Sequence, residues 1–484
     1  MDTPITIKKG LDIKLAGRPQ PVVSEALQAR QIGLCVTEYP GIKPRLRVKE
    51  GDVVKQGSVL FHDKKNEKFK VRSPAAGVVR STVFGPRRVL ERIVIDLVQQ
   101  EPAEDFPRFS EDEISGLSRE QILDHLQDTG LIALIRQRPF SRIADPAVAP
   151  KSIFVNGMNT APFQPDSNVV IQGHEKYFQA GLNALKNLTP GKVHLCIGHD
   201  MPNASPAVTQ AKNAVLHTFR GPHPSGNSSV HIAHIDPIEP GDAVWTIKAV
   251  DLVLIGQLLI EGRLPTTKVI ALGGPGVDDS ARKHYRVRIG VPLKDFLEGK
   301  LAAGEQRIVS GDALSGTEIP ADGFLRFLDS SLTVLPEDRS RHFMGWLAPG
   351  LNLFSDSRTF LSRWLNRRSE WNLTTNRHGS PRAMVLTGLY DRYMPMNILV
   401  DFLVRAVLAH DAREGGREAQ RLEAPRGDGA DAAHEPAIAR AVVAADLGVV
   451  RLERVFRDGH EHPEEVVEAR GGGADGGEEG VGVK

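Results

Sequence analysis

Residues 48–79 have the sequence VKEGDVVKQGSVLFHDKKNEKFKVRSPAAGVV, two valine-rich halves around a lysine-dense centre. Gly51 makes the first tight turn, Gly57 leads into the strand that carries Val59, and the segment 73–77 (SPAAG) returns the chain for a mirrored half. Glycine is favoured where φ must be positive, and proline fixes φ while giving up a donor. The stretch therefore predicts short strands joined by tight turns, with the lysines at a hairpin tip.

This layout is typical of the barrel-sandwich hybrid, the fold of lipoyl and biotinyl carrier domains, and we assign it to residues 1–100. A working carrier presents one exposed lysine at the hairpin apex for acylation. Here Lys64, Lys65, Lys68 and Lys70 share the tip, and none is set apart from the others. We therefore expect an unmodified structural or docking module. A carrier with a lipoylated or biotinylated lysine is the alternative.

The composition excludes several classes of protein. A length of 484 residues predicts three or four structural units. Sixty-one basic and sixty acidic residues leave no overall field for a nucleic-acid partner, and none is expected. Cys35 and Cys196 are too few for a cubane cluster or a cysteine-rich zinc site, so we predict no metal centre and no disulfide framework.

The segment after residue 110 changes to an α/β pattern. Ser118 stands three residues before Gln121, which is the spacing of a helix capping box. We predict strands at 152–158, 168–173, 192–198 and 229–237, and helices at 175–188 and 204–219. Continuous valine and isoleucine runs between helices indicate a mainly parallel sheet covered on both faces. Residues 110–258 are therefore predicted to be a Rossmann-like α/β domain.

Three further regions follow. Residues 262–316 alternate strand, strand, helix and strand, which predicts a small β-grasp (SLBB)-like domain. Residues 320–410 are mixed and predicted to be largely helical. Residues 411–484 contain no Ser, Thr, Asn, Cys, Met, Tyr or Trp, so this low-complexity tail is predicted to be disordered. Because the change of composition is abrupt, our hypothesis is a frameshift near codon 411.

No apolar run has the length of a membrane span. The two longest candidates, 249–262 and 397–410, are short and interrupted by Asp251, or by Asp401 and Arg405. We predict buried helices at both. The N-terminus also lacks the apolar core of a signal peptide, so a cytoplasmic or peripheral protein is expected.

Histidines gather between His194 and His234. With Cys196 and His199, His194 offers a candidate metal site, but the compact spacing of zinc motifs is missing, and ordinary core or surface histidines are the preferred interpretation. The loop 221–226 (GPHPSG) displays His223 between two predicted elements. A Gly-rich phosphate-binding motif is missing outside the tail, so a self-contained NADH- or ATP-using enzyme is poorly supported.

Several long motifs together resemble those of one family. They occur in this order: KKGLDIKLAG (8–17), the opening stretch, RPFSRIADP (138–146), IFVNGMNTAPFQPD (153–166), GPHPSGNSSVHIAHIDPI (221–238), VWTIKAVDLVLIGQL (244–258) and RIVSGDALSG (307–316). The chain is similar over residues 4–410 to the NqrA family of the bacterial Na⁺-translocating NADH:quinone reductases. Family members continue past residue 410 with an apolar and acidic helical ending, from which the tail here departs.

The resemblance implies a peripheral subunit on the cytoplasmic face of the inner membrane. Its complex has six subunits, oxidises NADH, reduces ubiquinone and exports Na⁺. Flavins and iron centres are expected in the five partner subunits, with no cofactor in this chain and ubiquinone as a ligand. The family is related to the C subunit of the Rnf complex and to the NADH-binding flavoprotein of complex I, so an Rnf-type flavin-binding subunit is a further alternative.

The isolated chain is expected to have no catalytic residues. A quinone-contact role is attributed to members of the NqrA family, and our candidates for it are Arg138, Phe140 and His223. The tip lysines Lys64, Lys65 and Lys68 are candidate partner contacts.

Overall fold

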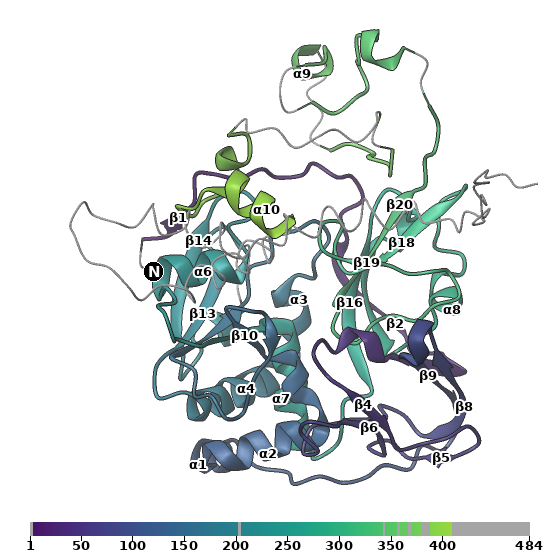
Figure 1. The fold of residues 1–484 in the computed structure, drawn as a ribbon, viewed down its shortest axis with the longest axis vertical. Helices are drawn as coiled ribbons and strands as arrows, with labels where there is room; N and C mark the ends of the chain where they lie inside the picture. The colour runs from purple at the N-terminus through teal and green to yellow at the C-terminus, as the bar shows by residue number, and fades with distance from the viewer. Residues whose placement is uncertain are drawn as a thin grey trace, which may run out of the picture.

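In the computed structural model the opening stretch contributes strands β5, β6, β7 and the start of β8 to two small sheets (Figure 1). One has the strand order β3-β9-β8-β5 and the other β4-β6-β7. The strands are β3 Gln31–Cys35, β4 Pro44–Leu46, β5 Val53–Val54, β6 Val59–Asp63, β7 Lys70–Arg72, β8 Gly77–Phe84 and β9 Leu90–Leu97. Leu60 and Phe61 of β6 are fully buried in the apolar core. Gly51 and Gly57 have φ of 89° and 98°, which confirms the predicted turns.

The structure describes residues 3–201, 205–341, 344–355, 359–365, 370–376, 378 and 388–408. The predicted tail 411–484 lies outside these residues, and its predicted disorder and the frameshift hypothesis stay predictions. Within the described part of the chain, every helix is too short or too polar to cross a bilayer.

The first strands of the chain lie outside the two small sheets. They pair with strands of two larger sheets, β1 with β14 and β2 with β17, both in parallel. The four strands are β1 Ile5–Thr6, β2 Gln20–Ala26, β14 Val215–Arg220 and β17 Lys283–Arg288. The Ile7 N–H also donates to the Arg220 carbonyl (2.7 Å). The beginning of the predicted 1–100 unit therefore completes the edges of two other sheets, whose N–H and C=O groups would otherwise lack partners.

The α/β region contains a seven-stranded sheet of order β1-β14-β13-β12-β15-β10-β11. The strands not yet given are β10 Arg136–Arg138, β11 Arg142–Ile143, β12 Ser152–Asn156, β13 Val193–Gly198 and β15 Val244–Lys248. The five strands from β1 to β15 are parallel, whereas β10 and β11 are antiparallel to their neighbours. The predicted parallel strands at 152–158 and 192–198 are confirmed.

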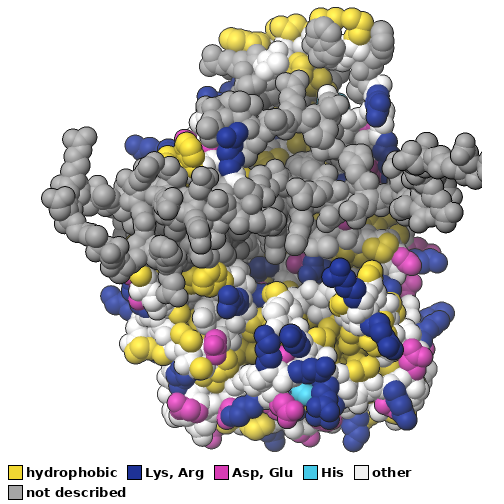
Figure 2. Space-filling model, in the orientation of Figure 1, with side chains coloured by type: hydrophobic (Ala, Val, Ile, Leu, Met, Phe, Trp, Pro, Cys, Tyr) yellow, Lys and Arg dark blue, Asp and Glu magenta, His cyan; other side chains and the backbone are white. Residues whose placement is uncertain are grey.

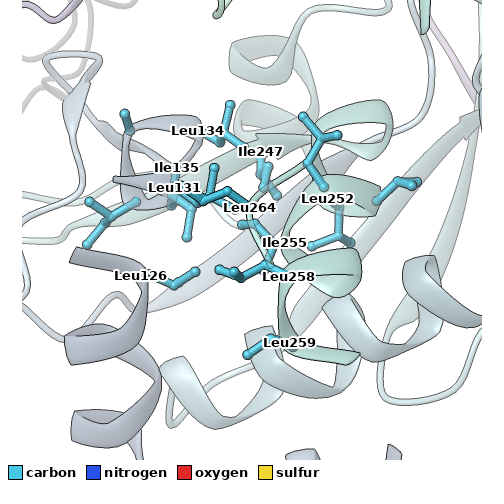
Figure 3. Close-up of a cluster of buried hydrophobic side chains, with 14 of the residues drawn as sticks. Leu126, Leu131, Leu134, Ile135, Ile247, Leu252, Ile255, Leu258, Leu259 and Leu264 are labelled. Atoms are coloured by element: carbon cyan, nitrogen blue, oxygen red, sulfur yellow. The ribbon is translucent and has the colours of Figure 1, made fainter. Parts of the chain in front are cut away.

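Helices cover both faces of this sheet, as predicted. Side chains alternate along β12, so that Val155 packs with α4 and α7, and Phe154 packs with α6 and α10. The helices are α1 Glu111–Gly116, α2 Arg119–Thr129, α4 Glu175–Leu188, α6 Ser228–Ile235, α7 Ala249–Glu261 and α10 Val400–Leu408. Figure 3 shows Leu126 of α2 and Leu258 of α7 in one apolar cluster. The capping box of Ser118 and Gln121 is present.

Two segments predicted as strands, 168–173 and 229–237, are helices instead. They form α3 Ser167–Ile171 and α6 Ser228–Ile235. Asp166 begins α3, because its side chain accepts a hydrogen bond from the Asn168 N–H (2.9 Å). A short apolar run fits a buried helix or a buried strand equally well, and here the pattern favoured the wrong element.

The predicted helix at 204–219 is also wrong. A short helix, α5 (Pro206–Thr209), ends early, and strand β14 follows it. Asn213 has a φ of 64° and reverses the chain between the two elements. Pairing with β13 places the second half of the segment in the sheet.

The third unit is a six-stranded sheet of order β19-β18-β20-β16-β17-β2. Its elements are β16 Thr267–Gly273, α8 Leu293–Leu297, β18 Gln306–Ser310, β19 Thr317–Glu318 and β20 Ser331–Pro336, with β17 and β2. The predicted strand–strand–helix–strand order is confirmed for the described elements. The sheet also recruits β20 from beyond residue 316 and β2 from the N-terminus.

The C-terminal region extends away from the three units before it returns. Its further elements are two 3₁₀ turns at Gly345–Leu347 and Tyr390–Arg392 and the short helix α9 Ser362–Leu365. Figure 1 shows α9 projecting from the body of the molecule. Helix α10 then packs on the seven-stranded sheet through Val400 and Val404, which are buried as predicted for this helix.

Candidate functional site

The lysine-rich tip is held against α2. Lys68 Nζ lies 2.8 Å from a carboxylate oxygen of Asp124, and Lys70 Nζ lies 2.6 Å from one of Asp128. One further contact is the hydrogen bond from Asn66 Nδ2 to Gln127 Oε1 (2.8 Å). These bonds join the barrel-like unit to the α/β region, and we name them the tip clamp. The hairpin of this carrier-like fold is therefore fixed to its own chain.

Arg72 forms the inner part of the tip clamp. Its guanidinium donates to Asp128 (2.9 Å) and to Glu104 (3.0 Å) and lies over the ring of Phe106. Partial burial acts to raise the pKa of Asp128, but hydrogen bonds from Lys70 and Arg72 outweigh it and hold the pKa below its usual value. Two cations therefore keep this carboxylate ionised.

Lys64 and Lys65 remain exposed at the end of the hairpin. Their backbone N–H groups donate to the Lys43 carbonyl and to Asp63, which fixes the turn that carries them. Of the predicted tip contacts, these two side chains are therefore presented to solvent, whereas Lys68 pairs within the chain.

Arg138 and Phe140, two residues of one predicted loop, have different surroundings. Arg138 is buried in β10 and donates through Nε to Thr246 Oγ1 (3.4 Å). Phe140 is 38% exposed, with the Arg142 guanidinium 4.8 Å from its ring centre. Phe140 can contact a ligand from solvent, but the Arg138 side chain is committed to the sheet.

His223 lies at the far end of the same sheet, after β14. Its Nδ1 is 3.0 Å from Thr160 Oγ1, and its backbone N–H donates to Asp12 (2.9 Å). Burial lowers the pKa of His223, so the ring is neutral at physiological pH. Strands β13, β12 and β15 separate this loop from β10, so the structure does not bring His223 together with Arg138.

The other histidines form a packed cluster. His194 Nδ1 is 2.9 Å from His217 Nε2, and His194 stacks on Phe154. Burial lowers the pKa of His194 to about 4 and that of His231 to about 3. His231 lies on α6, not on a strand as predicted, and packs against Phe219. Among the described residues, no group of three His, Cys, Asp or Glu side chains is arranged to hold a metal ion.

Sequence reasoning missed a buried charged site where the three units meet. Its centre is the segment 326–330, which we call the junction loop. Glu38 of the barrel-like unit accepts a hydrogen bond from the Leu328 N–H (2.9 Å). Lys248 of β15 contacts the Leu328 carbonyl (3.5 Å) and the Ser330 hydroxyl (3.3 Å). Each neighbouring unit thus holds the same short loop.

Lys268 of β16 makes the strongest set of contacts to the junction loop. Its ammonium donates to the carbonyl oxygens of Arg326 (2.9 Å), Phe327 (2.7 Å) and Asp329. Burial lowers the pKa of Lys268 to about 8 and raises that of Asp251. Burial also raises the pKa of Glu38 to about 7, despite the hydrogen bond from Leu328. Three ionisable groups are therefore removed from water together.

A small cavity of about 50 Å³ adjoins this site. Asp251, Lys268 and Ser330 line it, together with His174 and Arg286, whose ring and guanidinium nitrogens are 3.2 Å apart. Ligand sites for cofactor-sized molecules need roughly 300 Å³ or more. The cavity has room for a water molecule or two, but not for a nucleotide or a quinone ring.

One feature of the sequence pointed to the junction. Asp251 and Lys268 are single charged residues at the start of apolar runs, AVDLVLIGQLLI and TKVIALGG. A lone charge within a buried element usually has a polar partner. The sequence pattern could not identify the partner of Lys268, because its ammonium binds backbone carbonyl oxygens, which are present in every residue.

Comparisons with known proteins match the three units separately and the chain as a whole. Three family models match: "NqrA N-terminal barrel-sandwich hybrid domain" at residues 5–98, "NqrA second alpha/beta domain" at 117–264 and "NQRA C-terminal domain" at 269–320. The chain is 38% identical over 408 residues to the NqrA protein of the Na(+)-translocating NADH-quinone reductase of Histophilus somni (strain 2336), covering 84% of this chain and 90% of that protein. It is 39% identical over 412 residues to the corresponding protein of Hahella chejuensis, with the same coverage. Among solved structures, an NAD+-reducing [NiFe]-hydrogenase in the H2-reduced state is 15% identical, with a TM-score of 0.34, over 48% of this chain and 49% of that one.

Proposed function

The chain belongs to the NqrA family of the Na⁺-translocating NADH-quinone reductases, and we propose that it serves such a reductase as a peripheral subunit without a redox centre of its own. The whole complex is the enzyme, a translocase that oxidises NADH, reduces ubiquinone and exports Na⁺. This chain supplies assembly contacts to five partner subunits and a surface for ubiquinone. Its place is the cytoplasmic face of the bacterial inner membrane.

The tip clamp is the observation that carries this proposal. A carrier domain works by moving an acylated lysine between active sites, so its hairpin must be free. Here Lys68, Lys70 and Arg72 bind α2, and the hairpin is immobilised on the neighbouring unit. The barrel-sandwich hybrid thus acts as a scaffold, which favours the assembly role over a lipoylated or biotinylated carrier.

The two thiols support the lack of a redox centre. Burial raises the pKa of Cys35 to about 12 and raises that of Cys196 as well, so both stay protonated at physiological pH. They lie on strands of different sheets, β3 and β13. Cluster ligation requires several thiolates at one place. We therefore assign the iron centres and flavins to the partner subunits.

The α/β region supports a Rossmann-like assignment without dinucleotide binding. Numbered along the chain, the strands β12, β13, β14 and β15 occupy the spatial order 3-2-1-4, which begins the doubly wound fold. The turn after β12 has the sequence GMNTAPFQPD (157–166) and lacks the Gly-x-Gly-x-x-Gly fingerprint. NADH oxidation therefore belongs to a partner subunit. The largely helical nature of 320–410 stays part of the proposal, with α10 in its support.

Phe140 is the quinone candidate that this geometry favours, because its ring is exposed beside a cation. Arg138 and His223 would act by holding the backbone of their loops, since their side chains are bound within the chain. Lys64 and Lys65 are the tip residues that remain available to a partner subunit.

The test compares the complex expressed with and without this chain. We expect loss of NADH-driven ubiquinone reduction and of Na⁺ uptake by inverted vesicles when the chain is absent, and recovery when it is restored. The purified chain should be colourless between 350 and 500 nm, roughly the region of flavin absorbance, and its mass should equal that of the unmodified sequence. A yellow chain, an acylated lysine, or full turnover without the chain would each refute the proposal.

A further inference from the structure

The projecting part of the C-terminal region exposes many large apolar side chains. They lie in and beside a 3₁₀ turn and α9, in two short segments, 344–351 and 361–365, which we call the apolar lobe. The exposed residues are Met344, Leu347, Leu351, Leu361, Trp364 and Leu365. Trp364 is 58% exposed and Leu365 is 72% exposed. A contiguous exposed apolar patch marks an interaction site, because leaving it in water is costly.

The lobe lies away from the contacts that join the three units. Figure 2 shows hydrophobic side chains at the upper end of the molecule, where α9 lies in Figure 1. The barrel-like sheets and helix α2, which the tip clamp joins, lie towards the opposite end in Figure 1. A flat surface could therefore reach the lobe while the junction loop and the clamp stay intact.

Charge accompanies the apolar residues. Residues 339–377 contain seven arginines and two acidic residues, whereas the whole chain is almost neutral. Arg363 within the lobe and Arg341, shortly before it in the chain, are exposed, whereas Arg339 is paired with Glu305. Of the tryptophans in this segment, Trp364 is exposed and Trp371 is buried. Tryptophan with arginine is typical of groups that sit at a membrane surface, where one end is apolar and the other wet.

We propose that the apolar lobe inserts into the headgroup region of an anionic lipid bilayer, with Trp364 and Leu365 as anchors and Arg363 bound to lipid phosphates. An anionic lipid surface is the favoured occupant, because the segments 344–351 and 361–365 contain no acidic residue and Arg363 is exposed among their apolar side chains. The lobe gives the chain a second attachment to the membrane besides its partner subunits. The biological setting rests on the proposed function, but lipid binding by the purified chain does not.

The test is co-sedimentation of the full-length purified chain with vesicles of phosphatidylglycerol and phosphatidylcholine in equal amounts, and with pure phosphatidylcholine. We expect binding to the anionic vesicles that weakens as salt rises. The double change Trp364→Ser and Leu365→Ser should reduce the vesicle binding constant by roughly tenfold or more. Arg363→Gln should reduce binding to anionic vesicles by about fivefold and leave pure phosphatidylcholine unaffected.

The matched control is Val53→Ser, which removes a comparably exposed apolar side chain from the barrel-like unit. It should bind vesicles like the parent chain, and thermal unfolding should be the same for all variants because the changed residues are exposed. Failure of the parent chain to bind, or equal binding by the lobe variant, overturns the proposal. If the lobe variant instead fails to join the complex while the parent binds no vesicles, the lobe contacts protein and the lipid proposal is wrong. If vesicle binding holds but the complex turns over without this chain, the proposed function fails and the lobe assignment stands.

Discussion

The tip clamp and the junction loop both connect units of the chain, but the clamp does so through surface ion pairs and the junction loop through buried hydrogen bonds. The clamp joins side-chain charges near the surface, where water and salt screen them. The junction buries Glu38, Asp251 and Lys268, and satisfies the ammonium chiefly with backbone carbonyls. Removing one side chain from a screened ion pair lowers the free energy of unfolding little. Removing one from a buried hydrogen-bonded group lowers it more, because the remaining polar atoms then have neither water nor a partner. Stability should therefore depend on the junction far more than on the clamp.

Lys268→Met should have the largest effect. It keeps the aliphatic stem but leaves three carbonyls of the junction loop without their donor, so we expect the free energy of unfolding to fall by about 3–5 kcal/mol. Urea unfolding measures this change. Lys294→Met on the exposed face of α8 is the control and should change stability by less than about 0.5 kcal/mol. Similar values for the two variants would mean that the buried junction contributes no more to stability than an exposed lysine.

Glu38 should make the protein less stable as pH rises. Its pKa is raised in the folded state from 4.5 to about 7, so its carboxyl stabilises the fold while protonated and this contribution is lost between pH 4.5 and 7. The loss should be on the order of 3 kcal/mol. Glu38→Gln keeps an acceptor for the Leu328 N–H and should abolish this part of the pH profile. The free energy of unfolding of the parent chain and of Glu38→Gln, measured at several pH values, tests this. If the two chains have the same pH profile, ionisation of Glu38 does not destabilise the fold.

Asp128→Asn tests the clamp and should have a moderate effect. It weakens the pairs with Lys70 and Arg72, so we expect a loss of about 1–2 kcal/mol, most of it from the largely buried Arg72. The more exposed pair of Lys68 with Asp124 supplies the comparison, and Asp124→Asn should cost about 0.5 kcal/mol or less. High salt should reduce the difference between Asp128→Asn and the parent. A salt-independent difference would place this pair in the same class as the junction.

The smallest effect is expected at the end of the hairpin. Changing Lys64 and Lys65 together to Ala should alter the free energy of unfolding by less than about 0.5 kcal/mol, because both side chains are exposed. Chemical denaturation tests this directly. A loss as large as that of Asp128→Asn would mean that the whole tip, and not only its inner half, stabilises the fold.

The sequence predicted those elements whose local pattern is long or specific. The fourteen residues of α4, the Ser118 capping box and the turns at Gly51 and Gly57 are all local features, and each is confirmed. Segments 168–173 and 229–237 failed because a short apolar run does not distinguish helix from strand. Context beyond the segment decides such cases: the cap at Asp166 begins a helix at 168–173, and pairing with β13 makes the second half of 204–219 a strand.

The candidate site was less accessible to prediction. Lysines at 64–70 indicated a docking surface, but their principal partners, Asp124 and Asp128, lie on α2 of the same chain. The junction loop contacts Glu38, Lys248 and Lys268 only after three units have folded. The spacing of these residues along the chain does not indicate that they lie close together. The resemblance to a known family indicated the complex to which the chain is related, but it did not predict the contacts between the units of this chain.

The pairing of Ile5 with Phe219 sets an order of events during synthesis. The barrel-like strands find their partners soon after they leave the ribosome, because they pair with one another. Strand β1 must wait for β14, and β2 must wait for β17. Non-local pairing of this kind is slow to form, so the N-terminus stays unpaired while later units fold around its future position. Strands β1 and β2 are thus among the last to be placed, and a bulky group attached next to β1 should slow folding without removing any contact from the finished protein.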